Sequence, residues 1–272
     1  MPDLAHLLPM LLLLMAIGAI AGVISGLLGV GGGIILVPAF FYSFAALGYG
    51  DDTLMRVCTG TSLATIIVTS TRSVLAHNRR GAVDWRIIRG WAPGIVIGAI
   101  LGALMLARLK STALQAIFGA LSLIVAFYLG FGRSQWRLGL TMPSGPGRAA
   151  LSPLVGFLSV LMGIGGGSFG VPLMSIYGVP IHRAVATAAG WGVLIAVPAV
   201  AVLLFATVTA APPYTVGAVN LPAFLVIIAM TLITTPYGVR LAHATDAGPL
   251  KRIFAAFLTV VALNMLRKAV GW

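Results

Sequence analysis

The feature that most constrains the fold is a series of long apolar segments that together occupy most of the chain. A helix needs about 20 mostly apolar residues to span a membrane. The candidate segments are 7–28, 33–48, 54–76, 90–107, 112–131, 149–162, 168–179, 183–207, 220–240 and 250–268. Three of them are too short to span a membrane alone, 33–48, 149–162 and 168–179, and each adjoins a glycine cluster. We therefore expect an all-α integral membrane protein, a polytopic helical bundle.

Composition and charge agree with this class. The 272 residues are 60% hydrophobic and 8% charged, whereas about 25% of the residues of a soluble domain are charged. The net charge is +12, but the basic residues lie in short loops between apolar segments, which is typical of topology signals rather than of a nucleic-acid surface. We expect a multi-pass protein of the cell inner (plasma) membrane, embedded in the lipid bilayer and without a nucleic-acid partner.

The chain contains an internal repeat. The stretch GLLGVGGGIILVP at 26–38 recurs as VLMGIGGGSFGVP at 160–172, and GAVDW at 81–85 recurs as GAVNL at 217–221 with nearly the same offset. We therefore predict an N-terminal repeat at 1–131, a cytoplasmic connecting loop at 132–148 and a C-terminal repeat at 149–272. The two repeats form one transmembrane domain.

Loop charges predict that the two repeats have opposite orientations. The loop HNRRGAVDWRIIR carries four arginines, whereas its counterpart ATVTAAPPYTVGAVN carries no basic residue. Because basic loops face the cytoplasm, the two loops lie on opposite sides and the repeats are inverted. Inversion needs an odd number of crossings per repeat, so each glycine-rich region and the next segment contribute one crossing or three. We favour one, with a re-entrant helix pair broken at the glycines; three crossings remain the alternative.

The two helix breaks are candidate substrate sites. Secondary transporters commonly combine inverted repeats with broken helices and bind substrate near the membrane midplane. A helix that restarts after a break directs free N–H groups and a positive dipole into it, which favours an anion. The candidate substrate-binding residues at the breaks are Ser25, Gly31, Gly32, Gly33, Ser159, Gly165, Gly166, Gly167 and Ser168. Hydroxyls of the next segments add Thr61, Ser62 and Thr187. The alternative is that the glycines only allow close helix packing.

Other functions find little support in the sequence. GVGGGI does not match the dinucleotide-binding pattern G-x-G-x-x-G, and no GK[ST] follows either cluster. The apolar segments contain no nucleophile–base pair and no metal-ligand cluster, so we expect no enzyme activity, no cofactor and no metal site. Arg72 is placed some way into a segment, where it either extends to the interface or attracts an anion. The coupling ion stays unidentified because no aspartate lies within a predicted span.

These motifs resemble those of the TauE/SafE sulfite-exporter family over nearly the whole chain. The resemblance rests on GVGGGIILVP, GIGGGSFGVP, RVCTGTSLA, HRAVATAAG and the RGAVDW loop. It implies export of small sulfur-containing anions, sulfite or an organosulfonate, bound at Gly31–Gly33 with Ser25 and at Gly165–Gly167 with Ser159 and Ser168. The second hydroxyl motif differs, because Ala186 and Ala188 flank Thr187.

From these observations we expect a secondary transporter that exports a small anionic substrate by alternating access around the paired breaks. The alternative is an uptake permease or channel for another small oxyanion on the same scaffold. The anion, the direction, the coupling ion and the oligomeric state, including a homo-oligomer, stay open.

Overall fold

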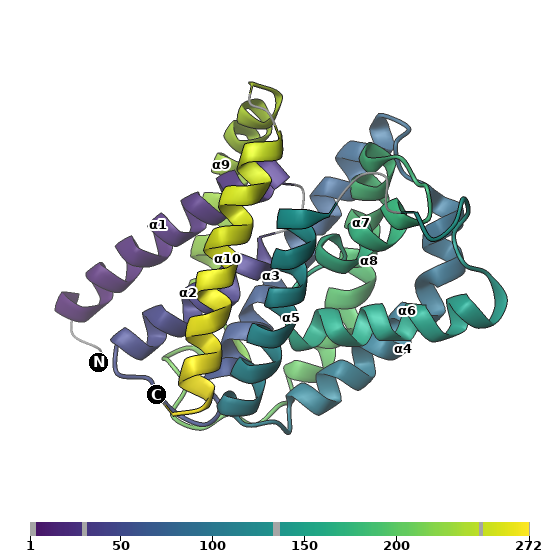
Figure 1. Ribbon diagram of the computed structural model, residues 1–272. Coiled ribbons are helices and arrows are strands. Elements are labelled where there is room, and N and C mark those ends of the chain that lie inside the picture. Colours follow the sequence, from purple (N-terminus) through teal and green to yellow (C-terminus); the bar gives the residue numbers. More distant parts are fainter. Residues whose placement is uncertain (1–3, 29–31, 133–136, 245–246, 272) are drawn as a thin grey trace.

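The computed structural model describes residues 4–28, 32–132, 137–244 and 247–271, and the chain is 78% helical. Each expected apolar segment corresponds to one helix (Figure 1). The helices are α1 Leu4–Leu28, α2 Gly33–Ala46, α3 Leu54–Arg79, α4 Trp85–Leu106, α5 Ser111–Phe131, α6 Gly145–Leu161, α7 Gly167–Ile176, α8 Ile181–Leu203, α9 Leu221–Ala244 and α10 Ala247–Ala269. This arrangement is that of an all-α protein.

Helix length and composition indicate several membrane crossings. Among the described residues, four helical segments are long and apolar enough to span a membrane: α4, α5, α8 and Leu221–Gly238 of α9. The helices that follow the glycine clusters are short, with 14 residues in α2 and 10 in α7. At 1.5 Å per residue, helices of this length cross only part of the hydrocarbon core.

Two helices, α4 and α6, begin four or five residues earlier than the hydropathy pattern predicts. We expected a segment from residue 90, but α4 begins at Trp85 because the Asp84 carboxylate accepts hydrogen bonds from the N–H groups of Arg86 (3.0 Å) and Ile87 (3.2 Å). We expected another from residue 149, but α6 begins at Gly145, with a proline in its first turn. In both cases the helix starts among polar residues, which lower the average hydropathy, because a capping side chain or a proline favours a helix start there.

A short hairpin precedes α9 and was not expected from the sequence. Strands β1 (Thr215–Val216) and β2 (Val219–Asn220) pair in antiparallel register. The Asn220 side-chain oxygen then accepts the N–H of Ala223 at 3.0 Å and caps the start of α9. The hairpin therefore fixes where α9 begins.

The two halves of the chain pack through reciprocal helix pairs. Helix α1 packs against α9, and its counterpart α6 packs against α4; α5 packs against α10, and α3 against α8 (Figure 1). Glycines allow the close approaches: a Cβ at Gly22 of α1 would overlap the Thr234 side chain of α9, and one at Gly156 of α6 would overlap the Ile95 carbonyl of α4. The halves therefore form one interlocked body.

Candidate substrate site at two helix breaks

The second glycine cluster ends α6 through a Schellman motif. The N–H of Gly163 bonds the carbonyl of Val160 at 2.9 Å, and that of Ile164 bonds the carbonyl of Ser159 at 2.9 Å. Gly163 has a φ of +64°, a conformation that favours glycine. The chain therefore leaves the helix at a defined point, with its backbone buried inside the protein.

Helix α7 starts at Gly167, four residues after Gly163, and Gly166 is its N-cap. The first-turn N–H groups of a helix have no partner within that helix. Gly166 is closely surrounded: a Cβ there would overlap the Ala188 carbonyl and lie 2.6 Å from Cβ of Trp191. This position accepts only glycine, which lets the start of α7 approach α8 directly.

The first cluster is described only in part. The predicted site residue Gly31 lies outside the described residues. Gly32 is the N-cap of α2 and Gly33 its first residue, and both are buried. Ser25, on α1, is half-buried. Figure 1 shows α2 running back beside α1 after this break.

The structure brings the two breaks into contact. A Cβ at Gly33 would lie 2.6 Å from the carbonyl oxygen of Gly163 and 3.0 Å from the Cα of Ile164. The hydroxyl of Ser62, on α3, donates to the same carbonyl at 2.7 Å. The Ile66 side chain, one turn further along α3, lies close to both Gly33 and Gly165. Both breaks therefore meet against one face of α3.

Several residues that contact or adjoin the second break carry an unpaired buried polar atom. Of the buried side-chain atoms without a hydrogen-bond partner in the described parts of the chain, four belong to these residues: Oγ1 of Thr59, Oγ of Ser159, Oγ of Ser168 and Nε1 of Trp191. Thr59 contacts Gly163, Trp191 contacts Gly166 and Gly170, and the two serines flank the break in sequence. An unsatisfied buried polar group costs about 1–3 kcal/mol. Such a group calls for an explanation, and an absent ligand supplies one.

Ser159 and Ser168 are among the residues predicted from sequence, whereas Thr59 and Trp191 are not. Thr59 belongs to a hydroxyl-rich stretch in which nothing singles it out. Trp191 stands between Gly190 and Gly192 inside a span, which is a weak signal at best. The Trp191 ring stacks on Trp91, with centroids 5.1 Å apart, and this contact fixes its orientation.

Thr61 and Thr187 take equivalent structural positions in the two halves. The Thr61 hydroxyl oxygen accepts the backbone N–H of Asn220 at 2.9 Å, and that of Thr187 accepts the N–H of Asp84 at 3.0 Å. Asn220 and Asp84 both cap the following helix. Each threonine therefore ties its helix to the start of a helix from the other half, and its oxygen already has a partner.

The second break contains no charged side chain. Residues 159–168 are apolar, glycine or serine. The sequence left two roles open for Arg72, one at the membrane interface and one in attracting an anion. The structure shows that Arg72 is exposed. Within the described ranges no group of three or more His, Cys, Asp or Glu residues could hold a metal ion. Any ligand at the break would therefore meet neutral donors and helix dipoles.

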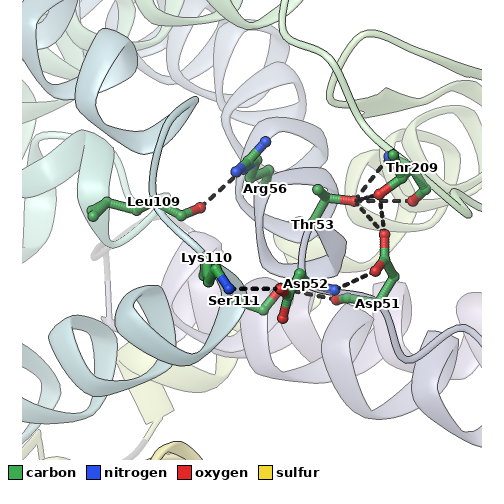
Figure 2. Close-up of polar contacts among 8 residues, drawn as sticks. All are labelled: Asp51, Asp52, Thr53, Arg56, Leu109, Lys110, Ser111 and Thr209. Atoms are coloured by element: carbon green, nitrogen blue, oxygen red, sulfur yellow. Dashed lines mark hydrogen bonds and ion pairs between the residues drawn. The ribbon is translucent and has the colours of Figure 1, made fainter.

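A second polar feature closes one end of the interface between the halves. We call it the Asp51–Thr209 cluster: Asp51, Thr53 and Arg56 from the first half, with Thr207 and Thr209 from the second. Figure 2 shows all of these residues except Thr207. The Thr53 hydroxyl accepts the N–H of Thr209 at 3.1 Å and donates to its carbonyl at 2.9 Å. The Thr209 hydroxyl donates to the Asp51 carboxylate, and this bond is the main cause that lowers the pKa of Asp51.

Arg56 extends the cluster to a third segment. Its Nε donates to the Leu109 carbonyl at 2.9 Å, and its Nη1 donates to the Thr207 carbonyl at 3.1 Å. The Ser111 hydroxyl, which lies beside Lys110 and Asp52 in Figure 2, donates to the Asp51 carbonyl at 3.1 Å. The cluster thus joins the start of α3, the α4–α5 loop and the segment after α8.

At the opposite end of the interface, the N–H of Asp84 donates to the Thr187 hydroxyl and joins the α3–α4 connection to α8. The α3–α4 connection is much shorter than the segment between α8 and α9. No hydrogen bond between described residues joins the connection at 80–84 to the α7–α8 connection at 177–180. The two ends of the interface are therefore joined by different sets of hydrogen bonds among the described residues.

Comparison with known proteins indicates a membrane transporter. The family model "Sulfite exporter TauE/SafE" matches residues 14–265. The chain belongs to this family.

The chain is similar to proteins named "Probable membrane transporter protein". One from Haemophilus influenzae is 31% identical, covering 95% of this chain and 98% of the relative. One from Methanocaldococcus jannaschii is 26% identical, covering 96% of each. YunE of Bacillus subtilis is 30% identical, covering 64% of this chain and 71% of the relative. No solved structure matches.

Proposed function

We propose that this transporter exports a small sulfur-containing oxyanion, sulfite or an organosulfonate, by alternating access around the two helix breaks. The observation that carries the proposal is the group of unpaired donors at the second break. Ser159, Ser168, Thr59 and Trp191 each present a buried polar hydrogen with no protein acceptor among the described residues. An oxyanion supplies several acceptor oxygens in a small volume, so it suits a site bordered by residues with neutral donors.

The helix start adds to this preference. The free N–H groups at the beginning of α7 and its positive dipole end favour negative charge. Neutral donors bind an anion without the strong Coulomb attraction of an arginine. Weaker attraction suits a transporter, because the substrate must also be released.

Reciprocal contacts support the inverted repeat. The pair formed by Thr61 and Asn220 has its counterpart in Thr187 and Asp84, and the α1–α9 pair has its counterpart in α6–α4. Such exchange of equivalent contacts is expected when two units are related by a two-fold axis. We place that axis in the membrane plane, because the arginine distribution of the loops requires opposite orientations.

The Asp51–Thr209 cluster fits one state of an alternating-access cycle. In the charge-based topology it lies on the side opposite the arginine-rich 77–89 loop. Its hydrogen bonds close that side, while the other end lacks a bridge between 80–84 and 177–180. Opening toward the cluster side would break these bonds, and the released halves could then move against each other.

The experiment that tests the proposal is flux in liposomes. Purified protein is reconstituted, and uptake of labelled sulfite is measured with and without a pH gradient, against unlabelled sulfonates, sulfate, thiosulfate and chloride. We expect saturable uptake that sulfonates inhibit and chloride does not. Folded protein that moves no oxyanion and shows no competition would overturn the proposal. Uptake that does not saturate would indicate the channel alternative.

A further inference from the structure

A large apolar groove lies on the outer surface between α5 and α10, away from the helix breaks. Its volume is about 840 Å³. It is lined by Leu123, Ile124, Ala126, Phe127, Gly130, Phe131, Arg252, Ala255, Ala256 and Thr259. In Figure 1, α5 and α10 run side by side at the front of the molecule. The transport site uses none of these residues.

Small and large side chains together give the groove its shape. Ala126, Gly130 and Ala255 are small, and a Cβ at Gly130 would only just touch Ala255, at 3.5 Å. Further along the pair, by contrast, Gly119 lies tightly against Leu266, where a Cβ would approach to 2.7 Å. The helices are thus in close contact at Gly119 and leave room beyond it.

The groove matches an acyl chain in polarity and is long enough for part of one. From Leu123 to Phe131 it follows α5 for about 12 Å, at 1.5 Å per residue. Ile124 is 61% exposed and Phe131 68% exposed, as expected of side chains that face lipid. The hydroxyl of Thr259 donates to the Ala255 carbonyl at 2.8 Å, so it presents no unsatisfied donor to an apolar occupant.

One cation lies at the end of this apolar surface. Arg252 is exposed, near the start of α10, and it lines the groove together with the last residue of α5. Its guanidinium has no hydrogen bond or ion pair with any described residue. An arginine near a helix end extends to the headgroup level of the membrane, where it attracts anionic lipid.

We propose that the α5–α10 groove binds one anionic phospholipid, with an acyl chain along the groove and its phosphate on Arg252. A simple interfacial anchor would explain Arg252 alone, but it would not explain a cavity that begins at the same residue. A second copy of this chain is a poorer occupant. The chain holds five acidic residues in all, and Asp51, Asp52 and Asp84 lie outside the helices, so a copy offers little to pair with a covered Arg252.

The test is native mass spectrometry of the full chain in detergent. The protein is titrated with phosphatidylglycerol and, separately, with phosphatidylcholine of the same acyl chains. The variants are Arg252→Ala, which removes the cation, and Ala256→Trp, which fills the groove and keeps the cation. Arg240→Ala is the matched control, because Arg240 is an exposed arginine on α9 that lies over the Tyr237 ring and does not line the groove.

We expect one phosphatidylglycerol per chain and weaker binding of phosphatidylcholine. Arg252→Ala should weaken phosphatidylglycerol binding about fivefold or more, Ala256→Trp should weaken both lipids, and Arg240→Ala should change neither. Equal binding of the two lipids, or wild-type affinity in Arg252→Ala, would overturn the proposal. Two further results would also overturn it: a dimer that Ala256→Trp abolishes, or displacement of the lipid by millimolar inorganic phosphate alone.

Discussion

Gly166 and Gly32 take equivalent places as the N-caps of α7 and α2, yet their surroundings differ. A Cβ at Gly166 would overlap the Ala188 carbonyl, whereas one at Gly32 would lie 3.5 Å from the Leu36 side chain, an ordinary contact. The same substitution should therefore have different consequences at the two positions.

We predict that Gly166→Ala abolishes sulfite flux and that Gly32→Ala retains most of it. The added methyl at 166 pushes the start of α7 away from α8, and overpacking of this kind costs about 1–3 kcal/mol. Flux in liposomes, normalised to folded protein, measures the difference. Wild-type flux in Gly166→Ala would show that the close approach is not needed.

The Ser62 hydroxyl should contribute to stability. It donates to the Gly163 carbonyl inside the protein, so Ser62→Ala leaves a buried acceptor without that donor. We predict a loss of about 1–3 kcal/mol in the free energy of unfolding, measured by denaturant titration in detergent. A variant as stable as the wild type would mean that the carbonyl finds another donor.

At this scale the sequence predicted residue types better than residue roles. The doubled glycine motif marked Gly166 and Ser168 directly. It could not show that Thr61 and Thr187 already have partners, or that Thr59 has none among the described residues, because those facts depend on the approach of distant helices.

Helices α3 and α8 carry most of the contacts that hold the breaks, and the Asp51–Thr209 cluster ties the start of α3 to the segment after α8. Cys58, the only cysteine of the chain, lies on α3 about 7.5 Å along the axis from Thr53. It is fully buried. It therefore serves as a built-in reporter of opening at this end.

We predict that Thr53→Val increases the reaction of Cys58 with a membrane-impermeant maleimide added from the cluster side. The substitution keeps the side-chain shape but removes both hydrogen bonds to Thr209, so the open state becomes easier to reach. Thr71→Val is the control, because its hydroxyl bonds only the Ile67 carbonyl of its own helix. Equal reaction in all three proteins would show that the cluster does not restrain opening.

The helices themselves could be located from sequence to within a few residues, because the lengths of the apolar segments and the glycine clusters beside them indicate where helices begin and end. The exceptions have local causes. The Asp84 cap starts α4 among arginines, and the short hairpin before α9 contains too few residues to give a strand pattern.

Across the whole molecule, the reciprocal pairing of helices from the two halves is the feature on which the proposed alternating access would depend. The repeated motifs predicted two copies of one unit. They could not predict that α1 would pack on α9 rather than on a helix of its own half. A single sequence does not show which distant segments are in contact.

Inverted orientation leads to a topology prediction. Arg80→Cys, in the arginine-rich loop, should react with an impermeant maleimide only after cells are permeabilised. Val216→Cys, in the hairpin and exposed, should react on intact cells. The wild type, in which the buried Cys58 is the only cysteine, measures the background reaction. Labelling of both sites from the same side would contradict the inverted repeat.

The central claim is that the anion binds at the second helix break, and equilibrium binding tests it most directly. Calorimetry would compare sulfite binding to the wild type, Ser168→Ala and Ser122→Ala. Ser122 also has a buried, unpaired hydroxyl, but it lies on α5, outside the breaks. Each variant therefore removes the same kind of group. A hydrogen bond to a charged ligand contributes about 1.5–3 kcal/mol, so Ser168→Ala should weaken binding at least about tenfold while Ser122→Ala binds like the wild type. Equal affinities in all three proteins would place the anion elsewhere.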